Sequence, residues 1–265
     1  MCGRAYSTYT EEELYLRYLN EKSKRHPTLG LKPNYNLSPT QISPVVLVRN
    51  GETTVELMRW GLIPFWAKDV KSAAKYSLIN AKAEEIETKR SYKASFEKRR
   101  CILPVTGFFE WHKEGDAPKQ PFAIHLKNHS IMSLAGIWEH WKSHTETPSE
   151  THTQTPTQTM TEIYSFSIIT TAANSFMKKI HSRMPAILSP RDEAIWLDPE
   201  IHDTAKLKKV LRSFADNDLG NDLDGSLDGS LDGSLNGELE AHAVSILVNS
   251  PKNNRKEVIE PIFPA

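Results

Sequence analysis

The chain has 265 residues, of which 38% are hydrophobic, and its 33 basic residues balance its 33 acidic ones. This length and apolar content suffice for the core of one large domain or two small ones. No run of about 18 apolar residues occurs and no apolar segment follows the first residues, which argues against a membrane span and a secretory leader. Two cysteines do not make a disulfide framework, so we expect a cytoplasmic protein.

The charge is divided unevenly along the chain. Residues 1–142 hold 22 basic and 15 acidic residues, whereas residues 143–265 hold 11 and 18. A basic front half is compatible with an anionic partner such as nucleic acid, although charged runs are more often solvated faces.

Cys2 directly follows the first methionine. A small second residue generally allows that methionine to be removed, which would leave an α-amine and a thiol on neighbouring carbons of Cys2. Such a pair can condense with an aldehyde to an imine and close to a five-membered thiazolidine, or the thiolate can act as an acyl-transfer nucleophile. Position 2 is also often frayed and tolerant, so for these four letters, "MCGR", taken alone, chance is the better explanation.

The next residues predict a helix and then a hairpin. Residues 10–13 have the spacing of a capping box for a helix over 11–24. Residues 45–60 alternate in polarity on both sides of Asn50 and Gly51, a pair typical of a type I′ turn between two strands.

The middle of the chain predicts further strands. Residues 121–138 repeat the hairpin pattern around a turn at 127–130. Cys101 lies in an apolar run that indicates a buried strand, and residues 164–173 indicate another.

The last third predicts two helices and a strand. Ser189 and Pro190 have the residue types of an N-cap and a first helical position. Residues 241–248 predict a final strand. Because strands and helices do not alternate strictly, we expect an α+β domain with a sheet built from hairpins. Residues 204–214 predict an amphipathic helix whose apolar face comprises Leu207, Val210, Leu211 and Phe214.

Two low-complexity segments are predicted to be insertions. Residues 143–162 are rich in Thr, Ser, Pro and Gln and have one apolar residue, so we expect a flexible loop. Residues 216–240 contain an LDGS repeat with eight acidic and no basic residues. A calcium-binding repeat has a different period and more glycine, so an acidic linker is the better interpretation.

Two motifs combine aromatic and polar residues in ways that core packing does not require. "RWGLIPFWAK" at residues 59–68 could provide a stacking platform for bases, with Trp60 interpreted as core and Trp66 as the platform. "SLINAKAE" at residues 77–84 could place Asn80, Lys82 and Glu84 in a cleft, and a turn-forming Asn is the simpler alternative.

Two further motifs offer proton-transfer groups. Glu110 lies among aromatic residues, where a carboxylate tends to be desolvated with a raised pKa, although an exposed strand position gives the same pattern. His181 lies two residues before Arg183, which suggests a proton shuttle beside a phosphate-binding guanidinium. His140 and His144 have i, i+4 spacing but no third ligand nearby, so we expect no metal site and no cofactor.

Taken together and in this order, the motifs resemble the SRAP family, the SOS-response-associated peptidases. The resemblance runs from Cys2 to the C-terminus, and we expect one SRAP domain over residues 2–262, interrupted by the two insertions. It implies a single α+β domain with a β-barrel-like core flanked by short helices. The motifs that carry it are "MCGR", "YNLSPTQ", "RWGLIPFWAK", "INAKAE", "GFFEW" and "HSRMPAIL".

The resemblance implies that the protein senses abasic sites in single-stranded DNA and forms a covalent thiazolidine crosslink through Cys2. It implies that Asn80 holds the reacting end of the sugar, Glu110 moves protons around the amine, and His181 assists ring opening and reversal. It implies a monomer at the DNA, in a nucleoid or a nucleus, with lyase-like chemistry and a restricted peptidase activity. The residues expected to contact the strand are Gly3, Arg4, Asn36, Pro39, Trp66, Lys82, Arg183, Met184 and Pro185.

Two positions depart from the family pattern. Lys82 stands where many relatives carry Arg, so a point charge replaces a bidentate phosphate contact. Ala67 stands where some relatives have a second Trp, which weakens the stacking argument. Neither departure changes a reacting group.

Two other function classes stay open. An N-terminal-nucleophile hydrolase, a peptidase or a glutamine amidotransferase, would also use Cys2, although the stretches typical of the amidotransferases are absent or altered. A non-catalytic single-strand binder would use the basic front half alone.

Overall fold

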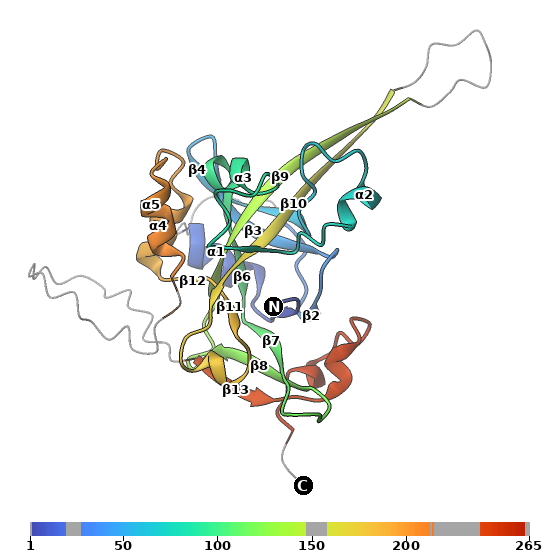
Figure 1. Cartoon of the computed structure of the whole chain (residues 1–265), viewed down its shortest axis with the longest axis vertical. Helices are drawn as coiled ribbons and strands as arrows, with labels where there is room; N and C mark the ends of the chain where they lie inside the picture. The colour runs from blue at the N-terminus through green and yellow to red at the C-terminus, as the bar shows by residue number, and fades with distance from the viewer. Residues whose placement is uncertain (1, 20–27, 147–157, 213, 215–238, 263–265) are drawn as a thin grey trace, which may run out of the picture.

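Two β-sheets organise the protein, which a computed structural model describes at residues 2–19, 28–146, 158–212, 214 and 239–262 (Figure 1). The larger sheet closes on itself, because β10 pairs with both β4 and β9 while β4, β3, β6 and β9 are joined in that order. Five strands therefore form a closed barrel, so the predicted α+β class and barrel-like core are confirmed. The larger sheet comprises β3 (Ile42–Arg49), β4 (Glu52–Trp60), β5 (Asn80–Lys82), β6 (Arg100–Val105), β9 (Met132–Glu146), β10 (Gln158–Ala172), β11 (Arg183–Pro185) and β12 (Ile187–Leu188).

The smaller sheet has the order β13-β8-β7-β1-β2. Its strand β1 lies between β7 and β2, so this early part of the chain has neighbours on both sides. Its strands are β1 (Ala5–Ser7), β2 (Asn34–Leu37), β7 (Gly107–His112), β8 (Gln120–Leu126) and β13 (Leu239–Ala243).

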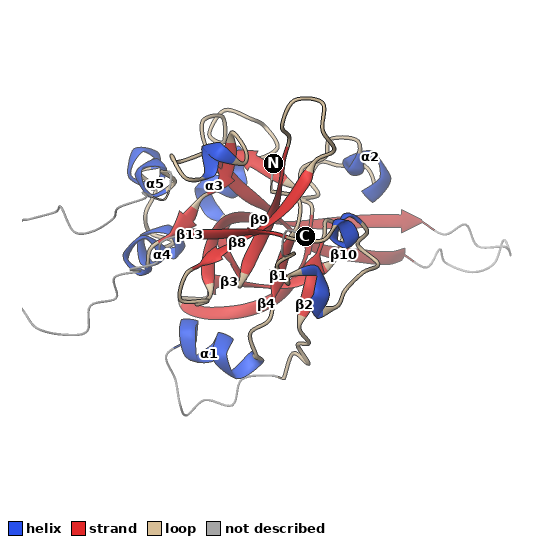
Figure 2. Cartoon of the chain, turned by 90° about the horizontal axis from the view of Figure 1, so that it is seen from below, coloured by secondary structure: helices blue, strands red, loops and turns tan. Residues whose placement is uncertain are grey.

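Short helices surround the strands (Figure 2). No described helix is long and apolar enough to cross a membrane. The α-helices are α1 (Glu11–Leu19), α2 (Val70–Ala74), α3 (Lys93–Lys98), α4 (Pro190–Leu197) and α5 (Thr204–Val210), and the 3-10 helices are η1 (Met177–Lys179), η2 (Ile246–Asn249) and η3 (Lys256–Val258).

Alternate residues of the barrel strands belong to different buried clusters. In β6, Cys101 and Leu103 belong to a cluster that reaches the smaller sheet, whereas Ile102 belongs to the cluster beneath the helices. This follows from the two-residue repeat of a strand, which points successive side chains to opposite faces. Cys101 is fully buried, as predicted.

Several local predictions are confirmed. Thr10 and Glu13 cap α1 reciprocally, with Glu13 N–H donating to the Thr10 hydroxyl at 3.2 Å. Asn50 and Gly51 have φ of 54° and 82° between β3 and β4, the positive values that a type I′ turn requires. Ser189 caps α4 by accepting the Asp192 N–H at 3.2 Å.

The hairpin predicted over 121–138 is wrong. Both edges of β8 are occupied by β7 and β13, and β9 pairs instead with β6, β10 and β12. The turn at 127–130 therefore carries the chain from one sheet into the other, with His129 at φ 54°. Periodicity identifies strands but not their partners, which is why the sequence could not show this crossing.

The bounds of both predicted insertions need correction. Residues 143–146 and 158–162 are not loop but paired strand, since Glu146 lies opposite Gln158 at the far end of the long β9–β10 hairpin. Its strands extend well beyond the barrel (Figure 1). Leu239 and Glu240 belong to β13. The remaining parts, 147–157 and 216–238, lie outside the described residues.

The ends of three predicted elements also differ. The helix predicted over 11–24 is described to Leu19, and residues 20–24 lie outside the described part. The helix predicted over 204–214 ends at Val210. Phe214 lies beyond it and packs in the cluster that contains Cys101, not in the cluster of Leu207 and Val210. The last predicted strand ends at Ala243, after which residues 246–249 form η2.

Candidate active site and nucleic-acid interface

The first described residues lie where the barrel meets the smaller sheet. Ala5 pairs with Leu37 on one side and with Phe108 on the other. Phe109 N–H donates to the Arg4 carbonyl at 2.9 Å, which continues the ladder beyond β1. Pairing on both sides thus positions the segment before β1.

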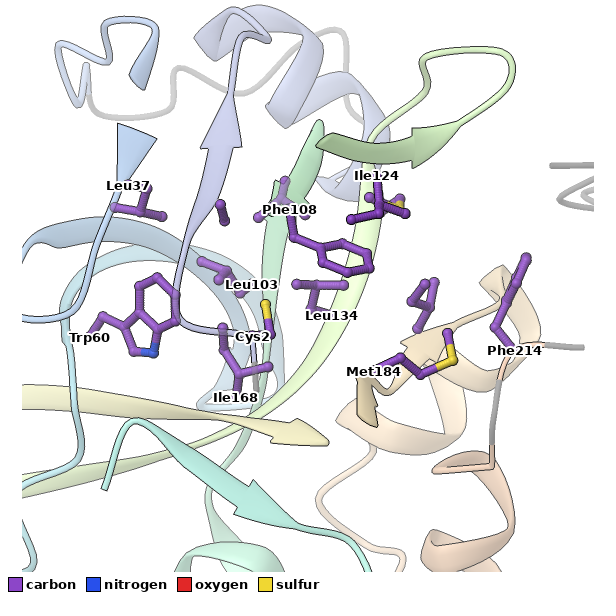
Figure 3. Close-up of a cluster of buried hydrophobic side chains, with 14 of the residues drawn as sticks. Cys2, Leu37, Trp60, Leu103, Phe108, Ile124, Leu134, Ile168, Met184 and Phe214 are labelled. Carbon is purple, nitrogen blue, oxygen red and sulfur yellow. The ribbon is translucent and has the colours of Figure 1, made fainter. Parts of the chain in front are cut away.

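Cys2 is fully buried within the cluster that joins the two sheets. Figure 3 shows its sulfur among Leu103, Leu134 and Ile168. Burial raises the pKa of the Cys2 thiol, and the negative charge of Glu110 raises it further. The thiol is therefore neutral at physiological pH and, in the chain that still carries Met1, shielded from solvent.

Asn80 connects the N-terminal segment to the barrel. Its side-chain Nδ2 donates to the Cys2 backbone carbonyl at 2.8 Å, and the backbone carbonyl of Asn80 accepts the Tyr92 hydroxyl at 2.9 Å. Residue 80 is aligned by the parallel pairing of β5 with β10, opposite Ile168. The amide of Asn80 thus fixes the backbone of Cys2.

Glu110 is the buried carboxylate of the site, with 2% of its surface exposed. Burial raises its pKa, and the positive charge of nearby His181 opposes that rise. Glu110 acts electrostatically on Cys2, and His181 acts on Glu110, so Glu110 lies near both of these predicted site residues.

His181 has a local partner for either protonation state. Its Nδ1 lies 3.0 Å from the Arg183 N–H and 3.1 Å from the Arg183 carbonyl. The N–H can donate to the neutral ring, whose proton then sits on Nε2, and the carbonyl can accept from the protonated ring. The backbone of Arg183 therefore orients the imidazole ring of His181.

The Arg183 guanidinium is held by the protein itself. It donates to both carboxylate oxygens of Glu84, at 2.6 and 3.0 Å, and to the Thr170 carbonyl at 2.6 Å. These bonds lower the pKa of Glu84. Lys82, the last residue of β5, is half exposed, and its Nζ lies 3.6 Å from Glu85 Oε1. The sequence placed Glu84 in a possible cleft but gave no sign of its pairing with Arg183, and it missed Thr170, since no spacing links either residue to position 183.

The Arg4 side chain is held by hydrogen bonds to buried groups of the protein. Its Nη1 donates to Asn36 Oδ1 at 2.8 Å and to the Val248 carbonyl at 2.6 Å. Asn36 is fully buried and donates to the Val248, Ser250 and Asn253 carbonyls. A buried side chain with these partners positions Arg4 and the C-terminal segment, and the direct contact of Asn36 with DNA stays a prediction.

The DNA contacts predicted for Met184 and Pro185 likewise stay predictions. Both are buried, and Met184 has no exposed surface because β11 pairs with β10 at the core. They support the strand that carries Arg183. Gly3 and Pro39, by contrast, are partly exposed.

Trp66 packs against Tyr76 and Arg90. Its ring meets Tyr76 edge-on at 5.6 Å, and the Arg90 guanidinium lies 5.1 Å over it. Tyr76 is 56% exposed, whereas Trp60 is fully buried, as predicted. Ala67, which stands where some relatives have a second Trp, is buried, and its carbonyl accepts the indole N–H of Trp141 at 2.7 Å.

Several predicted site residues carry buried polar atoms without a hydrogen-bond partner, as do three serines elsewhere in the described part of the chain. Within the described ranges they include Arg4 Nε, Trp66 Nε1, Asn80 Oδ1 and Arg183 Nε. Such atoms are costly unless something supplies the missing bond, so they mark places for a polar ligand. No group of three or more His, Cys, Asp or Glu in the described part could hold a metal ion.

Comparison with known proteins gives a consistent result. The family model described as SOS response associated peptidase (SRAP) matches residues 1–222. The abasic site processing protein YoqW of Bacillus subtilis is 33% identical over 98% of this chain and 99% of its own. The abasic site processing protein HMCES of Rattus norvegicus is 30% identical over 98% of this chain and 76% of its own.

A solved structure supports the fold independently. A protein from Bacteroides thetaiotaomicron superposes with a TM-score of 0.74 at 26% identity, covering 99% of this chain and all of that one. The arrangement of strands around Cys2 is thus set within a known architecture.

Proposed function

Because this chain belongs to the SOS response associated peptidase family, we propose that it processes abasic sites in single-stranded DNA by covalent capture through Cys2. The names of its relatives, abasic site processing proteins, support the substrate class. The observation that carries the proposal is the grouping of Cys2 with Asn80, Glu110 and His181.

The reaction begins with removal of Met1, which frees the α-amine of Cys2. The neutral amine attacks C1′ of the ring-opened sugar, and loss of one water gives an imine. The Cys2 thiol then adds across the C=N bond, with sulfur bonding to C1′ and the proton going to nitrogen. The product is a five-membered thiazolidine, which slows hydrolysis of the imine.

Each neighbouring group has a defined part in these steps. Glu110 accepts the proton of the ammonium form and returns it to the departing hydroxyl, a role suited to a carboxyl with a raised pKa. Asn80 holds the Cys2 backbone and offers Oδ1 to the sugar hydroxyls. His181 assists opening of the closed hemiacetal and reversal of the crosslink.

The flanking strand is held by cations and a stacking surface. Arg4, Lys82 and Arg183 supply positive charge for phosphates, and Gly3 allows a close approach of the backbone. Trp66 supports the base beside the gap left by the missing one, with Pro39 on the same path. We expect a monomer that acts wherever single-stranded DNA is exposed.

A denaturing gel tests the proposal. Purified protein is incubated with a single-stranded oligonucleotide that contains one abasic site, and Cys2→Ala and Cys101→Ala are compared. We expect a shifted band for the wild type and for Cys101→Ala, and none for Cys2→Ala. An equal band from Cys2→Ala would overturn the proposal.

The family description also includes the word peptidase, so a hydrolytic reaction is the second candidate. We propose that it is restricted to removal of the protein's own Met1. Glutaminase or general peptidase activity that Cys2→Ala abolishes would instead favour the hydrolase. Unchanged, salt-sensitive strand binding by Cys2→Ala without preference for a missing base would favour a simple binder.

A further inference from the structure

A small pocket lies between the turn after β2, the loop after β4 and the segment that leads into β5. Its volume is about 120 Å³. One water needs roughly 10–15 Å³ of such space, and an apolar cavity of about 150 Å³ can bind benzene. The pocket therefore has the scale of one planar ring.

The walls of the pocket are mainly aliphatic, with one cation. Leu62, Val70, Leu78 and Ile79 line it, and Arg59 is its only charged residue. Arg59 Nη1 donates to the Gly61 carbonyl at 2.9 Å, which leaves most of its donors to other acceptors, and among the described residues it pairs with no carboxylate.

This lining discriminates between ligands. A phosphate would lose its hydration against the aliphatic walls, which is costly for a charged group. A nucleobase places a flat, largely apolar ring between such walls and presents carbonyl and ring-nitrogen acceptors at its edge. Arginine is the side chain that most often donates to those acceptors in DNA recognition.

The backbone around the pocket is held in unusual conformations. Thr40, Gly61 and Ser77 line it with φ of 77°, 110° and 47°. A β-branched residue such as Thr40 rarely adopts a positive φ, and such conformations persist where the surroundings enforce them, often at ligand sites. The Thr40 N–H donates to the Trp60 carbonyl at 2.8 Å, which holds the turn.

The pocket adjoins the reacting end of the site. Ile79 lines it, and the next residue, Asn80, donates to the Cys2 carbonyl. The carbonyl of Ile79 also accepts the Trp60 indole N–H at 3.0 Å. On the other side, Thr40 directly follows Pro39. A strand whose abasic sugar reaches Cys2 therefore has a neighbouring nucleotide near this pocket.

We propose that the pocket receives the nucleobase next to the abasic site, with Arg59 donating to the acceptor edge of that base. The inference rests on the proposed function and adds a binding site for one intact base. A base beside a gap has already lost a stacking partner, so turning it out of the strand costs less than elsewhere.

Reversible binding tests the pocket without the crosslink. The oligonucleotides carry a central tetrahydrofuran residue, which lacks a base and cannot form an imine, and either normal neighbours or a second tetrahydrofuran on the 5′ or 3′ side. Fluorescence anisotropy gives the Kd for the wild type, Arg59→Gln and Ala74→Trp, which fills the pocket from α2. Ala205→Trp on exposed α5 is the matched control.

We expect removal of the neighbouring base on one side to weaken wild-type binding by about fivefold or more. Arg59→Gln and Ala74→Trp should lose a similar factor on the normal strand and little on the doubly baseless one, and Ala205→Trp should match the wild type. Equal wild-type affinity for all strands would overturn the inference. So would an equal loss for Arg59→Gln on every strand, which would assign Arg59 to a phosphate. Crosslinking of a true abasic site, measured separately, reports on the proposed function.

Discussion

One arginine lies on the helix-covered side of the barrel, and another lies near the N-terminal segment of the chain. The two differ in how completely their hydrogen-bond donors are paired. Arg100 is 5% exposed and donates to five backbone carbonyls at the ends of α3 and α4 and just beyond them. Arg183 is bound by Glu84 and Thr170, and its buried Nε has no partner in the described part. Complete pairing is typical of a structural arginine, whereas an incomplete set leaves room for a ligand.

The same contrast extends to the neighbours of each arginine. Trp196 beside Arg100 donates its indole N–H to the Cys101 carbonyl at 2.9 Å. Among the predicted site residues, Asn80 Oδ1 and Trp66 Nε1 are buried without such partners in the described part of the chain. The N-terminal end thus holds polar groups that folding alone does not satisfy, and changes in the two regions should affect different properties.

The largest effect on stability is expected at Arg100. Arg100→Met leaves several carbonyls at the ends of α3 and α4 without donors, and we expect the free energy of unfolding to fall by about 3 kcal/mol. Chemical denaturation measures it. Below the melting temperature, crosslinking should keep the wild-type rate. A variant as stable as the wild type would show that Arg100 is not a structural element.

Glu110 should show the largest effect on rate among residues other than Cys2. Glu110→Gln keeps the shape but cannot accept a proton, so we expect the crosslinking rate to fall by about 100-fold. The wild-type rate should rise with pH through the raised pKa of Glu110, and the variant should lack that step. Rapid-quench gels over a pH series measure both, and parallel profiles would exclude Glu110 as the base.

The contribution of Glu110 to the stability of the folded protein also depends on pH. Because burial raises the pKa of Glu110 in the folded state, the folded protein holds this proton more tightly than the unfolded chain. Its contribution is fully present below the ordinary pKa of a glutamate and is lost as pH rises through the folded value. The wild type should therefore lose stability relative to Glu110→Gln over that interval, which denaturation at several pH values checks.

A smaller effect is expected at Glu84, which competes with the strand for Arg183. Glu84 is half exposed, so its pair with Arg183 contributes little to stability. Glu84→Gln removes a negative charge beside the proposed strand path, and we expect binding to tighten by about twofold to fivefold at low salt. Anisotropy titrations should show the gain vanish at high salt. Weaker binding would mean that Glu84 serves mainly to hold Arg183 in place.

The smallest effect is expected at Lys82. Lys82→Arg restores the residue type of many relatives and adds a planar fork for a phosphate, so affinity should rise by about twofold or less. The same titrations measure it. A gain in affinity above tenfold would show that Lys82 limits DNA binding much more than this account predicts.

Much of this contrast could not be predicted from the sequence. Capping residues and the Asn50-Gly51 turn have local signatures, which is why α1, α4 and the first hairpin were predictable. The separation of β8 from β9 depends on which edges other strands occupy, and no local pattern carries that information.

The site shows the same limit. The resemblance predicts Cys2, Asn80, Glu110 and His181, and the structure brings them together. It does not separate residues that face a ligand from those that lie beneath it. The burial of Asn36 and Met184 comes from tertiary packing, as does the pairing of Glu84 with Arg183 across the sheet.

The mass of the crosslinked N-terminal peptide tests the central claim most directly. The wild-type protein is reacted with an abasic oligonucleotide, digested with nuclease and protease, and analysed by mass spectrometry. The account predicts a peptide that begins at Cys2 and carries the sugar remnant with the loss of one water. A crosslinked peptide that retains Met1, or an adduct on any other residue, would contradict it.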